Sequence, residues 1–162
     1  MARAVALISA FCILALAGIA HCAPEKFNVV GKVYCDTCRV QFETRISQSI
    51  KDAAVRLECR NLDNKTLTYS MEGATGADGN YNLTVDGDHE RDMCVVTVVK
   101  SPREDCKETV KGLEKAIVVC TANVGMKSDI RHANPLFFMK DLADERCSKV
   151  LEEIDFLPGQ TM

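Results

Sequence analysis

The residues of this 162-residue chain with the clearest potential for chemistry are six cysteines at fixed spacing. They follow an apolar N-terminal segment typical of export, and thiols in an oxidising compartment pair into permanent cross-links. The cysteines therefore predict a disulfide framework first, and a redox or metal site only second. They are Cys35, Cys38, Cys59, Cys94, Cys106 and Cys147, separated by 3, 21, 35, 12 and 41 positions.

The N-terminal segment predicts a secretion signal. Arg3 supplies the positive end, residues 4–20 are apolar, and small residues follow. Cleavage is expected before Ala23, with cleavage after Ala20 or after Ala23 as alternatives. A membrane anchor is the other interpretation, since about 20 apolar residues can span a bilayer. The small residues and Pro24 at the end of the run favour a signal.

We expect residues 1–22 to be the signal peptide and residues 23–162 to be a single secreted domain. Loss of Arg3 with the signal moves the formal net charge from −3 to −4. An acidic domain without a basic block is a poor ligand for nucleic acid or anionic membranes, and no later segment is apolar enough to span one. Few aromatic residues and no tryptophan disfavour an extended stacking platform, although a single sugar site stays open.

Hydrophobic periodicity predicts an all-β domain. Apolar and polar residues alternate over residues 53–59, 67–71 and 81–85, as in half-buried strands. Residues 27–34 are rich in β-branched and aromatic side chains, and Gly31 within them predicts a bulge or a close backbone approach. Further strands are expected at 94–100, an apolar run that suits a strand covered on both faces, at 116–120 and at 136–139.

Turn signals separate these strands. Asp78-Gly79 is a strong hairpin signal between the third and fourth strands. Residues 39–52 are expected to form a loop, and the charged segment 142–154 a short helical turn around Cys147. About seven short strands with turns between them predict an antiparallel β-sandwich or β-barrel.

The segment Val30-Gly-Lys-Val-Tyr-Cys-Asp-Thr-Cys38 resembles the signature of the Ole e I family of plant pollen proteins. The resemblance extends over about residues 27–150. It implies a seven-stranded antiparallel β-barrel or sandwich. The other matching segments are Leu57-Glu-Cys59, Asp78-Gly-Asn-Tyr81, Val85-Asp-Gly-Asp-His89, Lys100-Ser-Pro102 and Arg131-His-Ala-Asn-Pro135.

The resemblance also implies a disulfide pattern, which spacing alone could not choose among the 15 pairings of six cysteines. Cys120 lies outside the pattern at the end of an apolar segment, so a buried inert thiol is expected, with intermolecular pairing as the alternative. The implied bonds are Cys35–Cys106, Cys38–Cys147 and Cys59–Cys94.

Two other interpretations of the cysteines are less well supported. A redox pair at Cys35-x-x-Cys38 needs a low-pKa thiolate, usually at a helix N-terminus in a βαβ unit, whereas this motif follows a strand. Zinc needs a second Cys or His pair at suitable spacing, and His89 and His132 do not provide one. We therefore expect no metal.

Carboxylates offer no clear catalytic site. They alternate in the stretch 86–92, but the glycine and terminal glutamate of a calcium-binding EF-hand loop are not in place, so we expect a solvated connection. Glycoside hydrolysis needs two carboxyls with one held protonated, and no such pair stands out. No nucleophile-elbow motif is present. The sequence thus predicts no catalytic residue and no cofactor.

Two N-glycosylation sequons occur in the chain, at Asn64-Lys-Thr66 and Asn82-Leu-Thr84. Asn64 lies in a polar turn, and Asn82 falls on the polar phase of its strand. Both side chains are therefore expected to face solvent and to carry glycans.

The resemblance implies a secreted, non-enzymatic pollen protein of the extracellular space, around the pollen wall and pollen tube. It suggests a role in pollen hydration, germination or tube growth, allergenicity, and an extracellular receptor kinase as partner. A cell-wall polymer is the alternative partner, bound by surface aromatics such as Tyr69. A thiol oxidoreductase or a hydrolase is the least supported alternative.

Overall fold

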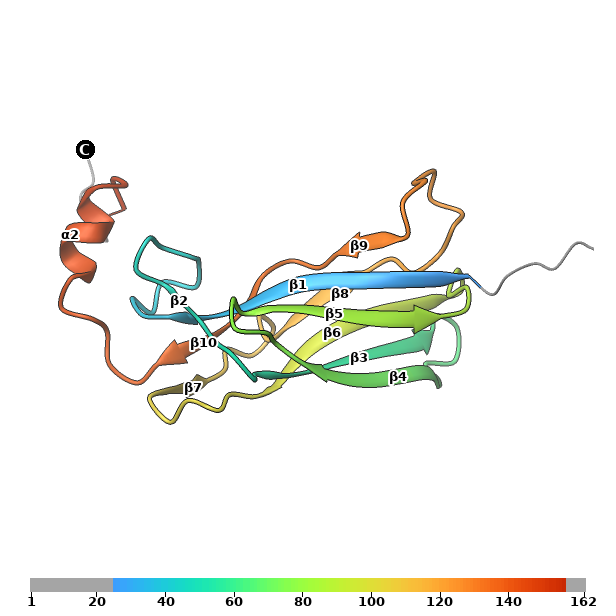
Figure 1. The fold of residues 1–162 in the computed structure, drawn as a ribbon, viewed down its shortest axis with the longest axis horizontal. Coiled ribbons are helices and arrows are strands. Elements are labelled where there is room, and N and C mark those ends of the chain that lie inside the picture. Colours follow the sequence, from blue (N-terminus) through green and yellow to red (C-terminus); the bar gives the residue numbers. More distant parts are fainter. Residues whose placement is uncertain (1–24, 157–162) are drawn as a thin grey trace, which may run out of the picture.

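The structure is a computed structural model that describes residues 25–156, and the signal peptide predicted at residues 1–22 lies outside the described residues. The described chain is all-β apart from one short helix, which lies at one end of an elongated molecule (Figure 1). The elements are β1 (Lys26–Asp36), β2 (Gln48–Ser49), β3 (Ala54–Asn61), β4 (Leu67–Ala74), β5 (Asn80–Asp86), β6 (Asp92–Lys100), β7 (Cys106–Glu108), β8 (Lys115–Val118), β9 (Ile130–His132), β10 (Leu136–Lys140) and α2 (Cys147–Glu152).

The strands form two sheets. One has the order β2-β1-β10-β7, with β5 and β9 also paired to β1, and the other has the order β4-β3-β6-β8. Over residues 25–156 these pairings do not close a barrel. The prediction of a fully antiparallel fold was wrong, because β1 pairs in parallel with β9 and β10. These two strands follow β1 only after a long excursion of the chain through the other sheet, so they are not bound to the antiparallel pairing that a short turn imposes.

The strand β1 is shared by the two halves of the first sheet. Its first part pairs with β5 and β9, and its last residues pair with β10 and β2. The register with β5 is continuous across Gly31, so no bulge occurs there. The close approach comes from the side chain of the opposite residue, Tyr81, because a Cβ at Gly31 would overlap the tyrosine hydroxyl group.

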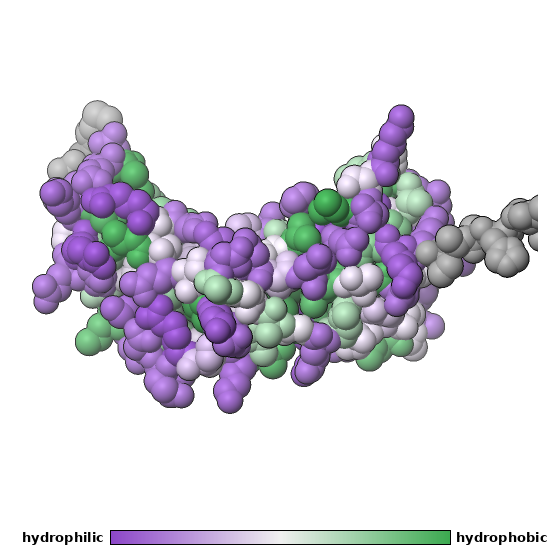
Figure 2. Space-filling model, in the orientation of Figure 1, coloured by the Kyte–Doolittle hydropathy of each residue, from purple (hydrophilic) through white to green (hydrophobic). Residues whose placement is uncertain are grey.

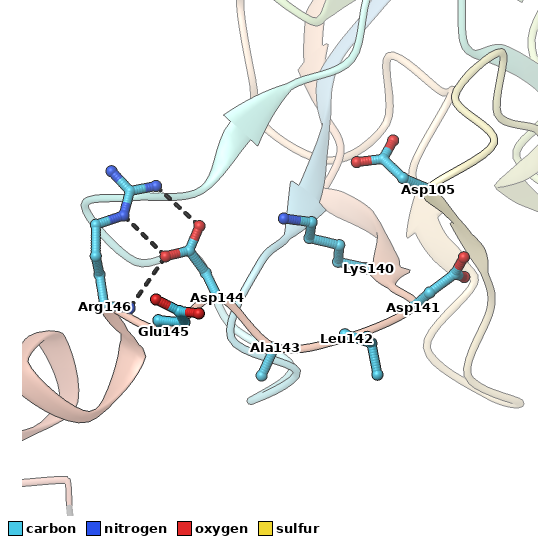
Figure 3. Close-up of a pocket in the computed structure, with 8 residues that line it drawn as sticks. All are labelled: Asp105, Lys140, Asp141, Leu142, Ala143, Asp144, Glu145 and Arg146. Atoms are coloured by element: carbon cyan, nitrogen blue, oxygen red, sulfur yellow. Dashed lines mark hydrogen bonds and ion pairs between the residues drawn. The ribbon is translucent and has the colours of Figure 1, made fainter.

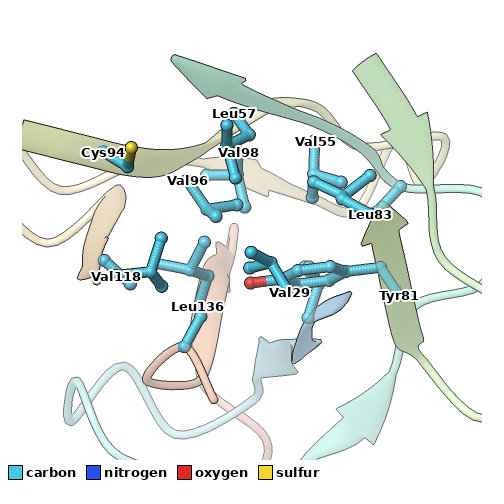
Figure 4. Close-up of a cluster of buried hydrophobic side chains, with 14 of the residues drawn as sticks. Val29, Val55, Leu57, Tyr81, Leu83, Cys94, Val96, Val98, Val118 and Leu136 are labelled. Carbon is cyan, nitrogen blue, oxygen red and sulfur yellow. The ribbon is translucent and has the colours of Figure 1, made fainter. Parts of the chain in front are cut away.

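The core lies between the two sheets and is built from side chains that point inward at alternate positions along the strands (Figure 4). The alternation predicted for β3 and β5 is confirmed. The prediction that residues 94–100 are covered on both faces was wrong, because Met93 and Val99 at the ends of the outer face of β6 are each about half exposed. The fully buried members include Val29, Val55, Leu57, Val85, Val96, Leu136 and Phe138.

The turn at Asp78-Gly79 was correctly predicted as a turn but wrongly as a hairpin. Gly79 has a φ of 79° and its N–H donates to the Gly76 carbonyl at 3.0 Å. However, β4 pairs with β3 whereas β5 pairs with β1, so the turn carries the chain from one sheet to the other. Turn chemistry reverses the chain locally, but burial of the inner face of β5 decides which strand it joins.

The structure has ten strands in the described residues, three more than predicted. The additional strands β2, β7 and β9 are two or three residues long and too short to show a periodicity. They form because β1 and β10 present backbone groups to them. The last predicted strand (β10) and the helical turn around Cys147 (α2) are confirmed.

Candidate functional site

The described structure contains three disulfides, and their pairs are those that the resemblance implies. Cys35 and Cys38 bond to cysteines 71 and 109 positions further along the chain, and not to each other. A thiol oxidoreductase needs a dithiol at this motif, and both thiols are consumed here. The bonds are Cys35–Cys106, Cys38–Cys147 and Cys59–Cys94.

Each disulfide joins a different pair of elements. Cys35–Cys106 links β1 to β7 across the intervening β10, and Cys59–Cys94 joins opposed residues of β3 and β6. The third bond ties the loop after β1 to α2. Loops of 35 to 109 positions are closed. In the chain-entropy model, a bond that closes a loop of this length stabilises the fold by about 4 to 5 kcal/mol when taken alone, because it restricts the unfolded chain.

The stretch 86–92 holds a buried histidine, which the prediction of a solvated connection missed. The exposed fraction of His89 is 9%. Its Nδ1 lies 2.8 Å from the Asp92 carboxylate, and its Nε2 lies 3.3 Å from the Asp86 carbonyl. The ring packs edge-on against Tyr69. The hydrophilic character of this stretch does not predict a buried pair, because only the fold turns the side chains of His89 and Asp92 inward.

A His–Asp pair resembles a general base, but this one lacks a nucleophile. In the triad arrangement the second ring nitrogen faces a hydroxyl or thiol, whereas His89 Nε2 faces a carbonyl. Although burial opposes the charged form, hydrogen bonds from Thr68 and His89 hold the pKa of the Asp92 carboxyl below its usual value. Asp92 and His89 therefore serve the packing of this corner of the fold.

The sulfurs of Cys59 and Cys94 lie within 4.8 Å of a ring nitrogen of His89, the spacing of a metal site. These sulfurs are bonded to each other in the disulfide, so neither is a thiolate. A soft metal needs such thiolate ligands. In the described structure the group thus offers a metal one ligand.

The depression between β10 and α2 has a volume of about 610 Å³ and a mostly charged lining (Figure 3). Asp144 accepts two hydrogen bonds from the Arg146 guanidinium at 2.8 and 2.9 Å, and Asp105 is held in the same way by Arg103. These bonds keep the pKa of both carboxyls below the usual range. Glycoside hydrolysis needs one carboxyl held protonated, and this pair is adapted for the opposite.

Tyr69 is not the surface aromatic that a polysaccharide site would use. It is half-buried against His89, and its hydroxyl donates to the Thr84 carbonyl at 3.3 Å. Among residues 25–156 the exposed aromatic ring is that of Phe156, which packs edge-on against Phe42. The described surface therefore presents no flat row of aromatic rings for a sugar chain.

The predicted modification sites lie on the surface, and the predicted free thiol lies inside. Asn64 and Asn82 are both exposed. The side-chain amide oxygen Oδ1 of Asn64 accepts hydrogen bonds from the N–H and the hydroxyl of Thr66, at 3.0 and 2.7 Å. Cys120 forms no disulfide within the described residues and is 2% exposed, and burial raises the pKa of its thiol to about 11.

The described surface is largely polar on the face shown in Figure 2, with small apolar areas between charged residues. None of the helices in residues 25–156 combines the length and the apolar character needed to cross a bilayer.

Residues 25–155 match the family described as pollen protein Ole e 1 like. The chain belongs to this family. It is 58% identical to the anther-specific protein LAT52 of Solanum lycopersicum over 98% of both chains. It is also 46% identical to the pollen allergen Che a 1 of Chenopodium album, over 92% of this chain and 90% of that one.

A solved structure supports the fold. The crystal structure of the major plantain pollen allergen Pla l 1 matches with a TM-score of 0.67 and 35% identity. The match covers 75% of this chain and 99% of the plantain allergen chain. The all-β fold is therefore shared with a pollen allergen.

Proposed function

We propose that this chain is a secreted, N-glycosylated pollen protein without catalytic activity. It acts outside the pollen cell, in hydration, germination or tube growth, by binding a protein partner such as an extracellular receptor kinase. The observation that carries the proposal is the 58% identity to the anther-specific LAT52 over nearly the whole of both chains.

The chemistry of the described residues supports a binding role over a catalytic one. Both cysteines of the Cys35-x-x-Cys38 motif are in disulfides, and the second nitrogen of His89 faces a carbonyl. The carboxyls of Asp105 and Asp144 are each paired with an arginine. A protein that works by contact needs a stable scaffold and an accessible surface, which three disulfides and a polar exterior supply.

Secretion and glycosylation are the first parts to test. Protein recovered from pollen exudate is expected to begin at Ala23 and to carry glycans on Asn64 and Asn82. N-terminal sequencing and glycopeptide mass spectrometry measure both. Retention of residues 1–22, or unmodified asparagines at both sequons, would contradict this part of the proposal.

The biological role is tested by loss and rescue in pollen. Silencing the transcript is expected to reduce germination and tube growth, and the full chain should restore them. A matched chain that lacks residues 1–22 should not rescue, because it is not exported. Unchanged tube growth after silencing, or equal rescue by the leaderless chain, would overturn the extracellular role.

A further inference from the structure

We propose that the exposed face of β6 and the edge strand β8 form a docking surface for an acidic, extended segment of a partner protein, which pairs with β8 as an additional strand. The surface, called the β8 patch below, is apolar at its centre and basic at its rim. The inference rests on the proposed function, because it names the surface through which a secreted binding protein would make contact. The β8 patch consists of Met93, Val95, Ile117 and Val119 with Arg60, Lys65 and Lys115.

The apolar centre of the β8 patch is unusually exposed for a protein with a largely polar surface. Ile117 is 64% exposed, and Val119 and Met93 are 47% and 45% exposed. The register places Ile117 directly opposite Val95, so these side chains share the outer face of the sheet. Large apolar side chains gathered on one face mark an interaction site more often than single exposed ones do.

The backbone of β8 is open to a further strand. The sheet order places β8 at an edge, with β6 on one side and no strand on the other within the described residues. Just beyond β8, the Arg131 guanidinium donates to the carbonyls of Val119 and Thr121 at 2.9 and 2.8 Å and covers that part of the edge. The backbone N–H and C=O groups of Lys115 and Ile117 have no such cover. An unpaired edge of this kind can accept an extended peptide.

The basic residues around the apolar centre favour an acidic binding partner. Arg60, Lys65 and Lys115 line a groove of about 380 Å³ on this face, together with the carboxylate of Glu58. Glu58 is already paired with Arg60 at 3.1 Å, so the two lysines are left without a carboxylate in the groove. The chain as a whole carries a net charge of −3, and this basic groove therefore stands out on an acidic protein.

This charge pattern favours a partner over a second copy of the chain. Pairing of β8 with β8 of another copy would bring the same lysines together, and like charges across an interface oppose association. An extended segment with an apolar residue opposite Ile117 and acidic residues opposite Lys115 satisfies both parts of the β8 patch.

The test uses the secreted, disulfide-bonded chain labelled with nitrogen-15, and a hexapeptide of the sequence Val-Thr-Val-Thr-Asp-Asp as probe. Titration is expected to shift the backbone amides of β8 and the facing part of β6 to saturation. The charge-reversed peptide Val-Thr-Val-Thr-Lys-Lys should not bind. Ile117→Lys and Lys115→Glu should each weaken binding at least about tenfold, the range expected for loss of a central contact. Leu142→Lys is the matched control, since Leu142 is 79% exposed outside the β8 patch.

Two results would overturn the docking surface. One is unshifted β8 amides at millimolar peptide, or unchanged affinity in both patch variants. The other is a dimer of the chain alone in sedimentation that Ile117→Lys dissociates, because the occupant would then be a second copy. Failure of the proposed function is seen separately: silencing that leaves tube growth unchanged contradicts the role in pollen, while shifted β8 amides still support the docking surface.

Discussion

At the scale of single residues, one glycine and one tyrosine show how closely the core depends on size. Gly31 of β1 lies under the ring of Tyr81, where a side chain would overlap the tyrosine hydroxyl group. The Tyr81 ring is 3% exposed, and its hydroxyl has no hydrogen-bond partner in the described structure. At this point the core therefore has no space for a side chain at residue 31 and offers no hydrogen-bond partner to a polar group.

Gly31→Val is expected to lower the free energy of unfolding by about 1 to 3 kcal/mol, because the added side chain displaces a packed ring. Urea denaturation measures the loss. In a Tyr81→Ala background the same substitution should cost less, since the clash is gone. Equal losses in both backgrounds would show that the ring is not the cause.

Tyr81→Phe is expected to leave the protein equally stable or make it more stable. No hydrogen bond is lost, and a desolvated hydroxyl with no partner is removed. The control is Tyr69→Phe, which removes a hydroxyl that does donate to a carbonyl. If Tyr81→Phe destabilised the protein more than Tyr69→Phe in thermal melts, this account of the site would fail.

Cys120 is expected to resist alkylation in the native state. Its thiol is buried, and burial raises its pKa to about 11, so little thiolate is present at pH 8. Iodoacetamide followed by mass spectrometry should show an unmodified Cys120 in native protein and complete modification in guanidinium. Rapid labelling of the native protein would instead indicate an accessible thiol capable of intermolecular pairing.

At the scale of elements, the three disulfides have different tasks. The bond between Cys59 and Cys94 lies within one sheet, whereas the bond between Cys38 and Cys147 fastens α2 to the rest of the molecule. The helix is six residues long and buries Cys147, Val150 and Leu151. A helix this short is not stable by itself, so its position depends on the bond and these contacts.

The double substitution of Cys38 and Cys147 by serine is expected to release α2 while the two sheets persist. Limited proteolysis should then cut within residues 141–146, at a rate well above that of the native protein, with the near-ultraviolet spectrum of the core little changed. The matched variant replaces Cys59 and Cys94 by serine, and should lower the denaturation midpoint without new cleavage at 141–146. Identical cleavage patterns in the two variants would contradict the separate tasks.

At the scale of the whole molecule, ion pairs should make stability depend on acid. Hydrogen bonds from Arg103, Arg39 and Arg146 lower the pKa of Asp105, Glu108 and Asp144 respectively. A carboxyl whose pKa is lower in the folded state stabilises the fold above its unfolded pKa of about 4, and this contribution disappears as the pH falls through the folded pKa.

The melting temperature is therefore expected to fall as the pH is lowered below about 4, through the depressed pKa values of the folded carboxyls. Thermal melts followed by circular dichroism measure the change. Because these pairs are partly exposed, high salt should screen them and weaken the dependence. A melting temperature that does not change over this range would show that the pairs contribute nothing to stability.

The sequence by itself determined the fold class, the approximate places of the long strands and the resemblance to a pollen family. These follow from local facts: the alternation in β3 and β5 is set by which side chains avoid water, and cysteine spacing is recorded directly in the chain. The exposure expected for Asn64 and Asn82 follows from the same local pattern, and the structure has both on the surface.

Only the tertiary structure decided which strands are neighbours. The Asp78-Gly79 turn is encoded locally, yet β5 pairs with β1 and not with β4, and β9 and β10 return parallel to β1. Likewise, His89 lies in a charged segment but is buried against Tyr69, and Met93 and Val99 on the outer face of β6 are about half exposed although the strand is largely apolar. Pairing and burial depend on contacts between residues far apart in the chain, whose free energies no local pattern records.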